Sequence, residues 1–442
     1  MKTNQPKVKE TIIQLLSNLG NPQEIDQYMK RFVNAGQAHF AVIKVGGAVL
    51  DNDLDNLCSS LAFLEQIGLF PIVVHGAGPQ LSKNLEAGNI ECQFIEGQRV
   101  TSAAVLRVAK KTFIQQNLKL ANKLQAMGVK TASITSGVFG ATLTTNTELG
   151  YVGEVNNIDL EPINAAIDSG AIPILSSLAE TDTGQYLNVN ADIATNQLAI
   201  ALKPYKIIFL TETGGLLNED GKIISSVNLA TDYDSLMMQD WLKGGMKLKI
   251  QQVADILSQL PATASVSITT PAHLAKELFT HKGSGTLLRK GEAIFTHVDS
   301  KSIEKQRLSH LLESGFDKVL DLDYFEKAHI HKSYITGCYR AAALITLPED
   351  VPKDIPFLDK FVVADDAKGE GLGKTVWRKL VEDNPKLFWR CRPDNTINGF
   401  YFKQSTGCYK TDEWTVFWYG VSDYKQIAEC IDYALSKPAT LN

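Results

Sequence analysis

The sequence lacks several features that define whole classes of protein. It holds no run of about 18 apolar residues, so we expect no segment that crosses a membrane. Its net charge is only −5, which gives no electrostatic basis for binding nucleic acid or a membrane surface. The N-terminal residues show neither the apolar centre of a signal peptide nor the arginine-rich pattern of a transit peptide. We therefore expect a protein of the cytoplasm.

Cysteine is scarce and scattered. The six cysteines stand at positions 58, 92, 338, 391, 408 and 430, and none forms a C-x-x-C pair. No group of histidine and cysteine residues has the spacing of a zinc site. We therefore expect no metal site built by the protein itself, and a reducing compartment fits this use of cysteine.

The remaining composition is that of an ordinary globular protein with two or three domains. Hydrophobic residues make up 44% of the 442 residues and charged residues 21%. A helical arm, broken before Pro22, is expected over residues 1–37. Apolar strands alternate with helices over residues 38–288, which predicts a mainly parallel α/β sheet covered by helices on both faces. Strands dominate residues 289–442, which predicts a smaller α+β domain.

One lysine interrupts the first apolar strand of the α/β region. Residues Ala41–Val45 are typical of a buried central strand, and Gly46 and Gly47 follow directly. A buried Lys44 needs a partner. A polyphosphate lying over the glycines would supply one, because glycine lets backbone amides approach an anion closely. The alternative is a plain turn after the strand.

Two more glycine-rich turns follow predicted strands, at His75–Gly78 and at Thr211–Gly215. A glycine-rich turn that opens a helix forms an anion site through its free amides and the helix dipole. Tight turns without a ligand are the alternative, which the recurrence of the pattern disfavours. Because ligands of parallel α/β sheets lie beyond the carboxyl ends of the strands, we expect these turns to face one site.

Two helices carry polar residues that a core does not explain. The segment Asn188–Asp192 leads into a helix predicted over Ile193–Leu202, which Asn188 or a neighbour is expected to cap. In a later helix, at about 100° per residue, Lys249 falls within the apolar face and Lys247 falls opposite. We therefore expect Lys247 in solvent, while the spacing leaves open whether Lys249 meets a phosphate.

Five motifs follow one another in the first domain: Val42–Gly47, Val74–Gln80, Gly97–Thr101, Asn188–Asp192 and Gly245–Lys249. Together they resemble the motifs of N-acetylglutamate kinases, which have the amino acid kinase fold. The resemblance covers about residues 40 to 288. It implies that Lys44 and Lys249 neutralise the transferring phosphoryl group and that Asp192 orients both lysines.

The same resemblance implies the rest of a kinase site. Arg99 and Asn188 are implied to hold N-acetylglutamate, and ATP is implied to bind with Mg²⁺. The γ-carboxylate of N-acetylglutamate is already ionised at neutral pH, so phosphoryl transfer needs no general base. Two positions depart from the family's pattern: Ala77 replaces the usual glycine, where its methyl group would crowd the phosphates, and Ser102 replaces aspartate. The residues expected to cradle the phosphates are Gly46, Gly47, Gly76, Ala77, Gly78, Thr211, Gly214 and Gly215.

A further glycine-rich turn, Lys282–Leu288, ends the first domain. It resembles the segment near the arginine site of arginine-sensitive family members, which also carry an N-terminal helical arm. We therefore expect an arginine effector that contacts Tyr28, Gly283 and Gly285.

The second domain repeats the combination of strand, glycine turn and helix. A strand is predicted over Leu358–Ala364 and a helix over Thr375–Glu382, and the turn Lys368–Lys374 between them suits a pyrophosphate. A later alternating strand places Arg390 and Arg392 on one face. Two arginines on one face suit a dicarboxylate ligand, and a solvated sheet face is the alternative.

Four motifs accompany this glycine turn: Phe357–Phe361, Phe388–Arg392, Tyr401–Lys403 and Val416–Gly420. From about residue 297 onward they resemble the GCN5-related acetyltransferase domain of vertebrate-like N-acetylglutamate synthases. The resemblance implies that Lys360, Arg390 and Arg392 bind the carboxylates of glutamate and that Asn395 and Tyr401 serve the reaction centre. Acetyl-CoA is implied to bind at Val362, Val363, Lys368, Gly369, Gly371, Gly373 and Lys374.

The order of the two domains resembles that of bifunctional N-acetylglutamate synthase/kinases. The expected function is acetyl transfer from acetyl-CoA to the α-amine of glutamate, followed by ATP-dependent phosphorylation of the γ-carboxylate, two steps of arginine biosynthesis. Three alternatives stay open: a synthase whose silent kinase-like domain senses arginine, a kinase with a regulatory C-terminal domain, and a non-enzymatic arginine sensor. We also expect a homo-oligomer, in the form of a dimer of dimers.

Overall fold

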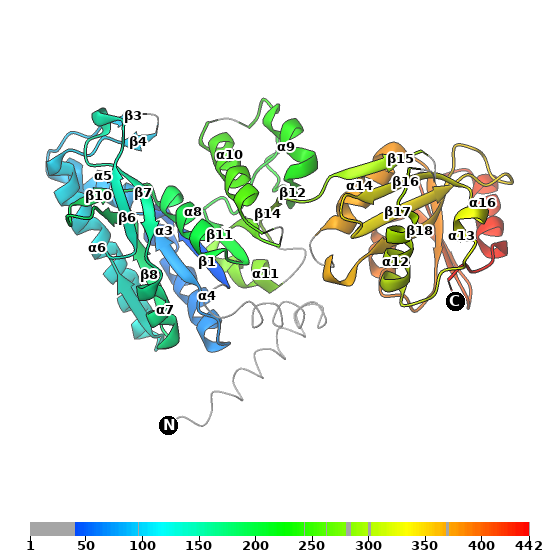
Figure 1. Cartoon of the computed structure of the whole chain (residues 1–442), viewed down its shortest axis with the longest axis horizontal. Helices are drawn as coiled ribbons and strands as arrows, with labels where there is room; N and C mark the ends of the chain where they lie inside the picture. The colour runs from blue at the N-terminus through cyan, green and yellow to red at the C-terminus, as the bar shows by residue number, and fades with distance from the viewer. Residues whose placement is uncertain are drawn as a thin grey trace, which may run out of the picture. The chain divides into compact units, whose positions relative to one another are not determined.

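The computed structural model describes residues 40–441, apart from residues 96, 243, 262, 280–283, 299–301 and 368–370. The chain forms two compact units, the first ending at Lys290 and the second starting at Gly291 (Figure 1). The helical arm expected over residues 1–37 lies outside the described part of the chain. Among the described residues, no helix combines the length and the apolar character needed to cross a membrane.

An eight-stranded sheet forms the centre of the first unit, in the order β12-β14-β13-β11-β1-β2-β8-β5. Strand β1 lies between β2 and β11, and both pairings are parallel. Only the pairing of β13 with β14 is antiparallel within this sheet, so the prediction of a mainly parallel sheet is confirmed. The strands are β1 (Ala41–Val45), β2 (Ile72–His75), β5 (Thr131–Ile134), β8 (Ile172–Ser176), β11 (Lys206–Leu210), β12 (Ser226–Asn228), β13 (Ser265–Thr269) and β14 (Thr286–Arg289).

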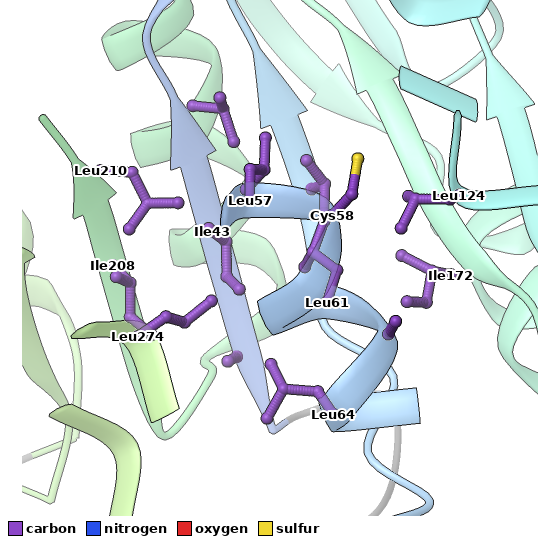
Figure 2. Close-up of a cluster of buried hydrophobic side chains, with 14 of the residues drawn as sticks. Ile43, Leu57, Cys58, Leu61, Leu64, Leu124, Ile172, Ile208, Leu210 and Leu274 are labelled. Atoms are coloured by element: carbon purple, nitrogen blue, oxygen red, sulfur yellow. The ribbon is translucent and has the colours of Figure 1, made fainter. Parts of the chain in front are cut away.

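Helices cover both faces of this sheet. They are α3 (Gly47–Asn52), α4 (Leu54–Gln66), α5 (Gly78–Ala87), α6 (Ala103–Ala126), α7 (Glu161–Asp168), α8 (Ala191–Leu202), α9 (Leu229–Met237), α10 (Gly244–Gln259) and α11 (Leu274–Phe279). Figure 2 shows Ile43 of β1 in one buried cluster with Leu57 and Leu61 of α4. Val42 belongs to a second cluster with Leu198 of α8. Because successive side chains of a strand alternate between faces, Lys44 shares the face of Val42 and lies on the side of α8.

Two smaller sheets lie beside the main one. In the first of them, β3 (Phe94–Ile95) pairs with β4 (Gln98–Arg99). A four-stranded sheet has the order β10-β9-β6-β7. Its strands are β6 (Phe139–Leu143), β7 (Gly153–Ile158), β9 (Leu178–Glu180) and β10 (Tyr186–Asn188). These sheets place Arg99 and Asn188 at the ends of β4 and β10.

The second unit is built on a seven-stranded sheet in the order β15-β16-β17-β18-β19-β21-β20. Parallel strands β18 and β19 pair only through Phe357 with Phe388 and Leu358 with Trp389. Strand β18 stays paired with β17 as far as Val363, so β18 and β19 separate after Leu358. The strands are β15 (Ile294–His297), β16 (Ile330–Thr336), β17 (Ala341–Thr346), β18 (Phe357–Val363), β19 (Leu387–Cys391), β20 (Gly407–Lys410) and β21 (Thr415–Tyr419).

Five helices complete this unit: α12 (Lys305–Phe316), α13 (Tyr324–Lys327), α14 (Leu372–Asp383), α15 (Asn398–Gln404) and α16 (Tyr424–Ser436). Several aromatic side chains of this unit lie in its core. Trp377, Trp389 and Phe417 are buried together in one cluster with Tyr401. Unit 2 therefore has its own apolar core and meets the α+β expectation.

Candidate active sites

The first two glycine turns of unit 1 lie against each other. A Cβ added to Gly47 would come within 2.7 Å of both Pro79 Cδ and Gln80 Oε1, and Gln80 Nε2 donates a 2.7 Å hydrogen bond to Gly47 O. The N-caps of α3 and α5, Gly46 and Ala77, form no side-chain capping bond. Two helix N-termini without a side-chain cap thus meet at one place, which suits an anion.

The N-terminus of α8 joins this place. A Cβ on Gly76 would lie 3.3 Å from Ala191 Cβ. The cap of α8 is Asn190, whose Oδ1 accepts a 2.7 Å bond from the amide of Asp192. The cap predicted at Asn188 or a neighbour is therefore two residues further on, and Asn188 itself ends strand β10. Asp192 consequently occupies the first turn of α8.

Three predicted site residues come together here. Lys44 Nζ lies 2.7 Å from Asp192 Oδ1, and both side chains are largely shielded from solvent. Burial lowers the pKa of Lys249, an effect that Asp192 opposes and Lys44 reinforces. Lys249 Nζ also lies 5.7 Å from the ring centre of Phe209. Lys44 thus pairs with Asp192, and Lys249 is close enough to feel both charges, so two cations and one carboxylate lie near the glycine turns.

The prediction that Lys247 points into solvent is wrong. Its side chain is half-buried, and Nζ donates a 2.9 Å hydrogen bond to the carbonyl oxygen of Met237. The helical wheel placed Lys247 correctly away from the apolar face, but it could not show that the C-terminal turn of α9 lies there. A carbonyl near a helix C-terminus is a favourable partner for a cation.

The third glycine turn follows β11, next to β1 in the sheet. Thr211 Oγ1 accepts a 3.1 Å bond from the amide of Gly214, whose φ of +72° favours glycine. Asn52 Nδ2 at the end of α3 donates a 2.6 Å bond to Glu212 Oε1. The structure therefore connects this turn, including Gly215, to the helix that the first turn opens.

Two family departures have structural explanations. Ala77 is buried in a cluster with Leu81 and Val105, so its methyl group packs into the protein beneath α5. Ser102 caps α6, and its Oγ accepts a hydrogen bond from the amide of Val105. The Ala77 methyl group is thus buried within the protein, and Ser102 has a local role as a helix cap.

Arg99 adjoins the second glycine turn. Its guanidinium donates to Gly78 O at 3.2 Å, Ser82 Oγ at 2.8 Å and Cys92 Sγ at 2.6 Å. It also lies 4.7 Å from the ring centre of Phe94. These contacts hold the cation at the edge of the turn.

Asn188 is held by a residue that the sequence reasoning missed. Asn188 Nδ2 donates a 3.1 Å bond to Thr101 Oγ1, and Thr101 Oγ1 donates to Arg99 O at 2.9 Å. Thr101 thereby links the two residues that the resemblance assigns to N-acetylglutamate. It closes the quoted motif Gly97–Thr101, so its position next to the site could have been noticed.

His75 is a second residue to which sequence reasoning gave no role. It is fully buried at the end of β2, and burial lowers the pKa of His75 to about 4. The imidazole is therefore neutral at physiological pH, and it lies beside Gly76 with Nδ1 3.3 Å from Gly76 O. A neutral ring at this position adds no charge to the glycine turns.

The turn expected to bind arginine is described only in part. Tyr28 and Gly283 lie outside the described residues. The amides of Ser284 and Gly285 both donate to the buried Glu277 Oε2, at 3.0 and 3.2 Å. A Cβ on Gly285 would lie 2.0 Å from Ile268 O, so no other residue fits this position without a shift of the backbone.

In unit 2, a helix N-terminus faces the end of β18. Gly371 is the N-cap of α14 with φ of +81° and no side-chain cap. A Cβ on Gly373 would lie 2.9 Å from Val363 Cγ2, so the turn approaches the strand closely. Lys374 lies in the first turn of α14, whereas Lys368 and Gly369 lie outside the described residues. The amides of α14 and the unpaired side of β18 at Val362 and Val363 therefore adjoin one another.

Tyr401 lies next to this part of β18. Its ring centre is 6.4 Å from that of Phe361, 5.8 Å from Trp377 and 5.3 Å from Trp389. Burial raises the pKa of Tyr401 well above 10, with a smaller contribution from Cys391. The phenol therefore remains protonated. Asn395 lies in the turn after β19, where its Oδ1 accepts a 3.1 Å bond from the amide of Ile397.

Lys360 belongs to a buried charge cluster. A bulge in β18 leaves Asp359 as the extra residue, since Lys360 pairs with Leu344 and Leu358 with Ile345. Lys360 Nζ lies 2.7 Å from Asp359 Oδ2, which also accepts a 2.6 Å bond from the hydroxyl of Tyr324. Burial lowers the pKa of Lys360, and Asp359 opposes this. The cluster requires its carboxylate to stay ionised.

Arg390 and Arg392 share one face of the sheet, as their spacing predicts. The central carbon of each guanidinium lies 3.9 Å from the ring centre of Trp414. Arg390 donates to Ala434 O at 2.6 Å and Pro438 O at 2.9 Å, and Arg392 pairs with Glu413 Oε1 at 2.8 Å. The two cations therefore lie on one aromatic platform.

Comparison with known proteins assigns a family to each part of the chain. Residues 39–266 match the amino acid kinase family, and residues 294–437 match the family described as NAT, N-acetyltransferase, of N-acetylglutamate synthase. An acetylglutamate kinase of Xanthomonas campestris pv. campestris is 49% identical over 424 residues, which are 96% of this chain and 100% of the relative. The mitochondrial N-acetylglutamate synthase of Danio rerio is 30% identical over 425 residues, which are 95% of this chain and 78% of the relative.

A solved structure shows the same fold. N-acetylglutamate synthase from Neisseria gonorrhoeae, complexed with coenzyme A and N-acetyl-glutamate, aligns with a TM-score of 0.64 at 18% identity. The alignment covers 90% of this chain and 97% of that chain. The two matched ranges thus define an amino acid kinase unit followed by an N-acetyltransferase unit. The chain belongs to the amino acid kinase family, and its homologues include acetylglutamate kinases and N-acetylglutamate synthases.

Proposed function

We propose that this chain catalyses two successive reactions, acetylation of L-glutamate and phosphorylation of the resulting N-acetyl-L-glutamate. The meeting of Lys44, Asp192 and Lys249 at uncapped helix N-termini is the observation that carries the kinase half. The charge cluster beside the separated strands β18 and β19 supports the acetyltransferase half. One relative is named acetylglutamate kinase and another N-acetylglutamate synthase, which supports the presence of both activities in one chain.

In the kinase reaction, the γ-carboxylate of N-acetylglutamate attacks the γ-phosphorus of ATP, and the bond to the β-phosphate oxygen breaks. The carboxylate is ionised at neutral pH, so positioning and charge neutralisation are what the protein must supply. Lys44 and Lys249 neutralise the transferring group, and Asp192 fixes both lysines. The glycine turns at 46–47, 76–78 and 211–215 bind the phosphates, with Mg²⁺ held on the nucleotide. Arg99 and Asn188 hold the substrate.

In the acetyl transfer, the neutral α-amine of glutamate attacks the thioester carbon of acetyl-CoA, so a C–N bond forms and the C–S bond breaks. Backbone amides of β18 after Phe361 stabilise the oxyanion. The phenol of Tyr401 gives its proton to the leaving thiolate, a role that its raised pKa allows because the group stays protonated. The proton that the attacking nitrogen loses passes to water, from which the phenolate is protonated again. Lys360, Arg390 and Arg392 bind the carboxylates of glutamate, Asn395 serves the reaction centre, and the turn at 368–374 binds the pyrophosphate.

One experiment tests both reactions. The purified chain is given glutamate, acetyl-CoA and Mg-ATP, and release of free thiol and of ADP is followed together. We expect thiol release without ATP, and ADP release only once acetylglutamate is present. An ATP-dependent hydroxamate assay on added acetylglutamate then separates an active kinase from a silent domain. Thiol release without hydroxamate would indicate a silent kinase-like domain that senses arginine. Hydroxamate without thiol release would indicate a kinase with a regulatory second unit. The absence of both products would indicate a non-enzymatic sensor.

Regulation, assembly and location form a separate proposal. We propose that arginine binds at the turn that includes Gly285, which a titration of either activity with millimolar arginine tests. Assembly as a dimer of dimers is measured by light scattering on the eluting protein. The cytoplasmic location rests on six cysteines that are all free, and fractionation of cells tests it.

A further inference from the structure

The C-terminal segment Lys437–Leu441 contacts the cations that are proposed to bind glutamate. Thr440 Oγ1 accepts a 2.7 Å hydrogen bond from Lys360 Nζ, and Arg390 donates a 2.9 Å bond to Pro438 O. Leu441 forms a β-bridge with Leu320, which holds the segment in place. The segment therefore occupies hydrogen-bond donors that a substrate carboxylate needs.

The charges of this cluster favour an anionic ligand. Asp359 lies 2.7 Å from Lys360 and 2.9 Å from Lys437, so one carboxylate faces two ammonium groups. Arg390 adds a third cation close enough to influence Lys360. Three cations around one buried carboxylate leave positive charge without a partner within the cluster, and a dicarboxylate substrate would neutralise it.

The three N–H donors of the Lys360 ammonium group already have acceptors, so a substrate carboxylate must replace one of them. An ammonium group has three N–H donors. Lys360 Nζ lies 2.7 Å from Asp359 Oδ2, 3.4 Å from Asp359 O and 2.7 Å from Thr440 Oγ1. Only 7% of the Lys360 side chain is exposed, so water does not offer a free approach. The bond to the buried carboxylate is charge-assisted, whereas the Thr440 hydroxyl is neutral and is the weaker partner.

We propose that Thr440 competes with the substrate carboxylate for Lys360 and thereby sets the affinity for glutamate. This inference rests on the proposed glutamate site. Glutamate binds by displacing the Thr440 hydroxyl and takes over its hydrogen bond. Thr440 is thus a positioning residue, which acts through Lys360 and touches neither the thioester nor the amine.

Two substitutions at this position test the competition in opposite directions. Thr440→Val removes the hydroxyl but keeps the shape, so KM for glutamate should fall about three- to tenfold, the worth of one hydrogen bond. Thr440→Asp offers Lys360 a carboxylate, so KM for glutamate should rise about tenfold or more. KM for acetyl-CoA and kcat should stay within about twofold in both. Thr296→Val, at an exposed threonine of β15, is the control for a generic effect on unit 2.

A purely structural role of the segment predicts a different result. If both substitutions raised KM for glutamate, or if Thr440→Val left it unchanged, the competition would be refuted. Lys360→Met separates this failure from a failure of the proposed site. If KM for glutamate were unaltered in Lys360→Met, the proposed glutamate site itself would be wrong. If KM rose strongly in Lys360→Met but did not change in Thr440→Val, only the role of Thr440 would be wrong.

Discussion

Asp359 and Lys360 are neighbours in sequence, yet their side chains form a 2.7 Å ion pair on the same side of β18. In a regular strand, adjacent side chains point to opposite faces. The bulge at Asp359 removes this alternation, because two residues of β18 then oppose one residue of β17. The pair thus depends on an irregularity of the backbone, and it places a cation and its counter-ion beside the C-terminal segment.

Removing the buried carboxylate should destabilise unit 2. Asp359→Asn leaves Lys360 and Lys437 buried without their counter-ion, which should cost about 3–5 kcal/mol of unfolding free energy. Burial raises the pKa of Asp359, but Lys360, Lys437 and Tyr324 outweigh this and hold it well below the usual range. The stabilisation is therefore present above about pH 4 and is lost as pH falls below that value. Denaturant unfolding followed by tryptophan fluorescence measures both effects.

The control for this prediction is Asp354→Asn. Asp354 pairs with Lys386 at 2.6 Å on the surface of the same unit, and solvent screens such pairs. It should barely shift the unfolding midpoint. Equal losses in the two variants would show that the buried cluster has no special role.

The two lysines of α10 should differ sharply in the kinase reaction. Lys249→Met removes an ammonium group beside Asp192, so phosphorylation of acetylglutamate should fall at least about a hundredfold while acetyl transfer is kept. Lys247→Met is the matched control, because Lys247 Nζ donates its hydrogen bond to the carbonyl oxygen of Met237 at the end of α9. It should keep kinase turnover within about threefold. Similar losses in both variants, measured by ADP release, would contradict the assignment.

Tyr401→Phe should slow acetyl transfer without weakening substrate binding. The ring contacts in the aromatic cluster are kept, but the thiolate loses its proton donor, so kcat should fall about ten- to a hundredfold. Because burial raises the pKa of Tyr401 well above 10, the wild-type rate should show no loss from its ionisation up to pH 10. Tyr409→Phe, at an exposed tyrosine of β20, is the control. This role would be contradicted if the wild-type acetyl-transfer rate fell between neutral pH and pH 10 and if this fall were absent in Tyr401→Phe.

His75 should make unit 1 sensitive to mild acid. Its pKa is lowered to about 4 by burial, so the folded unit keeps the ring neutral while the unfolded chain protonates it near pH 6.5. Its contribution is therefore complete above pH 6.5 and declines as pH falls to about 4, by up to about 3 kcal/mol. His75→Gln should flatten this dependence, measured by hydrogen exchange at β2 amides, and His273→Gln, at an exposed ring, should not.

Much of the first site could be predicted because one kind of signal repeats. Apolar runs that end in glycine give the strands and their turns, and β1 has the bounds that the sequence predicts. A buried lysine implies a partner, for which the residues suggested a polyphosphate. The structure pairs Lys44 with Asp192, the residue that the resemblance names as orienting it. The cap of α8 was less predictable, because Asn188 and Asn190 are chemically alike and only the pairing of β10 with β9 decides between them.

The second site depended more on tertiary contacts. Spacing alone could place Arg390 and Arg392 on one face, but it could not show that Trp414, from a different strand connection, supports both. The bulge at Asp359 leaves no clear mark in the sequence, since neither glycine nor proline accompanies it. Thr440 is far from Lys360 in sequence, so no local pattern could join them.

The short pairing between β18 and β19 divides the sheet of unit 2 into two parts. Two residue pairs between β18 and β19 join strands β15 to β18 to strands β19 to β21, so the sheet consists of two parts with a short junction. After Leu358, the edge of β18 that faces β19 is no longer paired with it, so a ligand could lie along this edge as an extra strand would. If acetyl-CoA binds there as we propose, its thioester arm would bridge the two parts of the sheet where their own strands no longer pair.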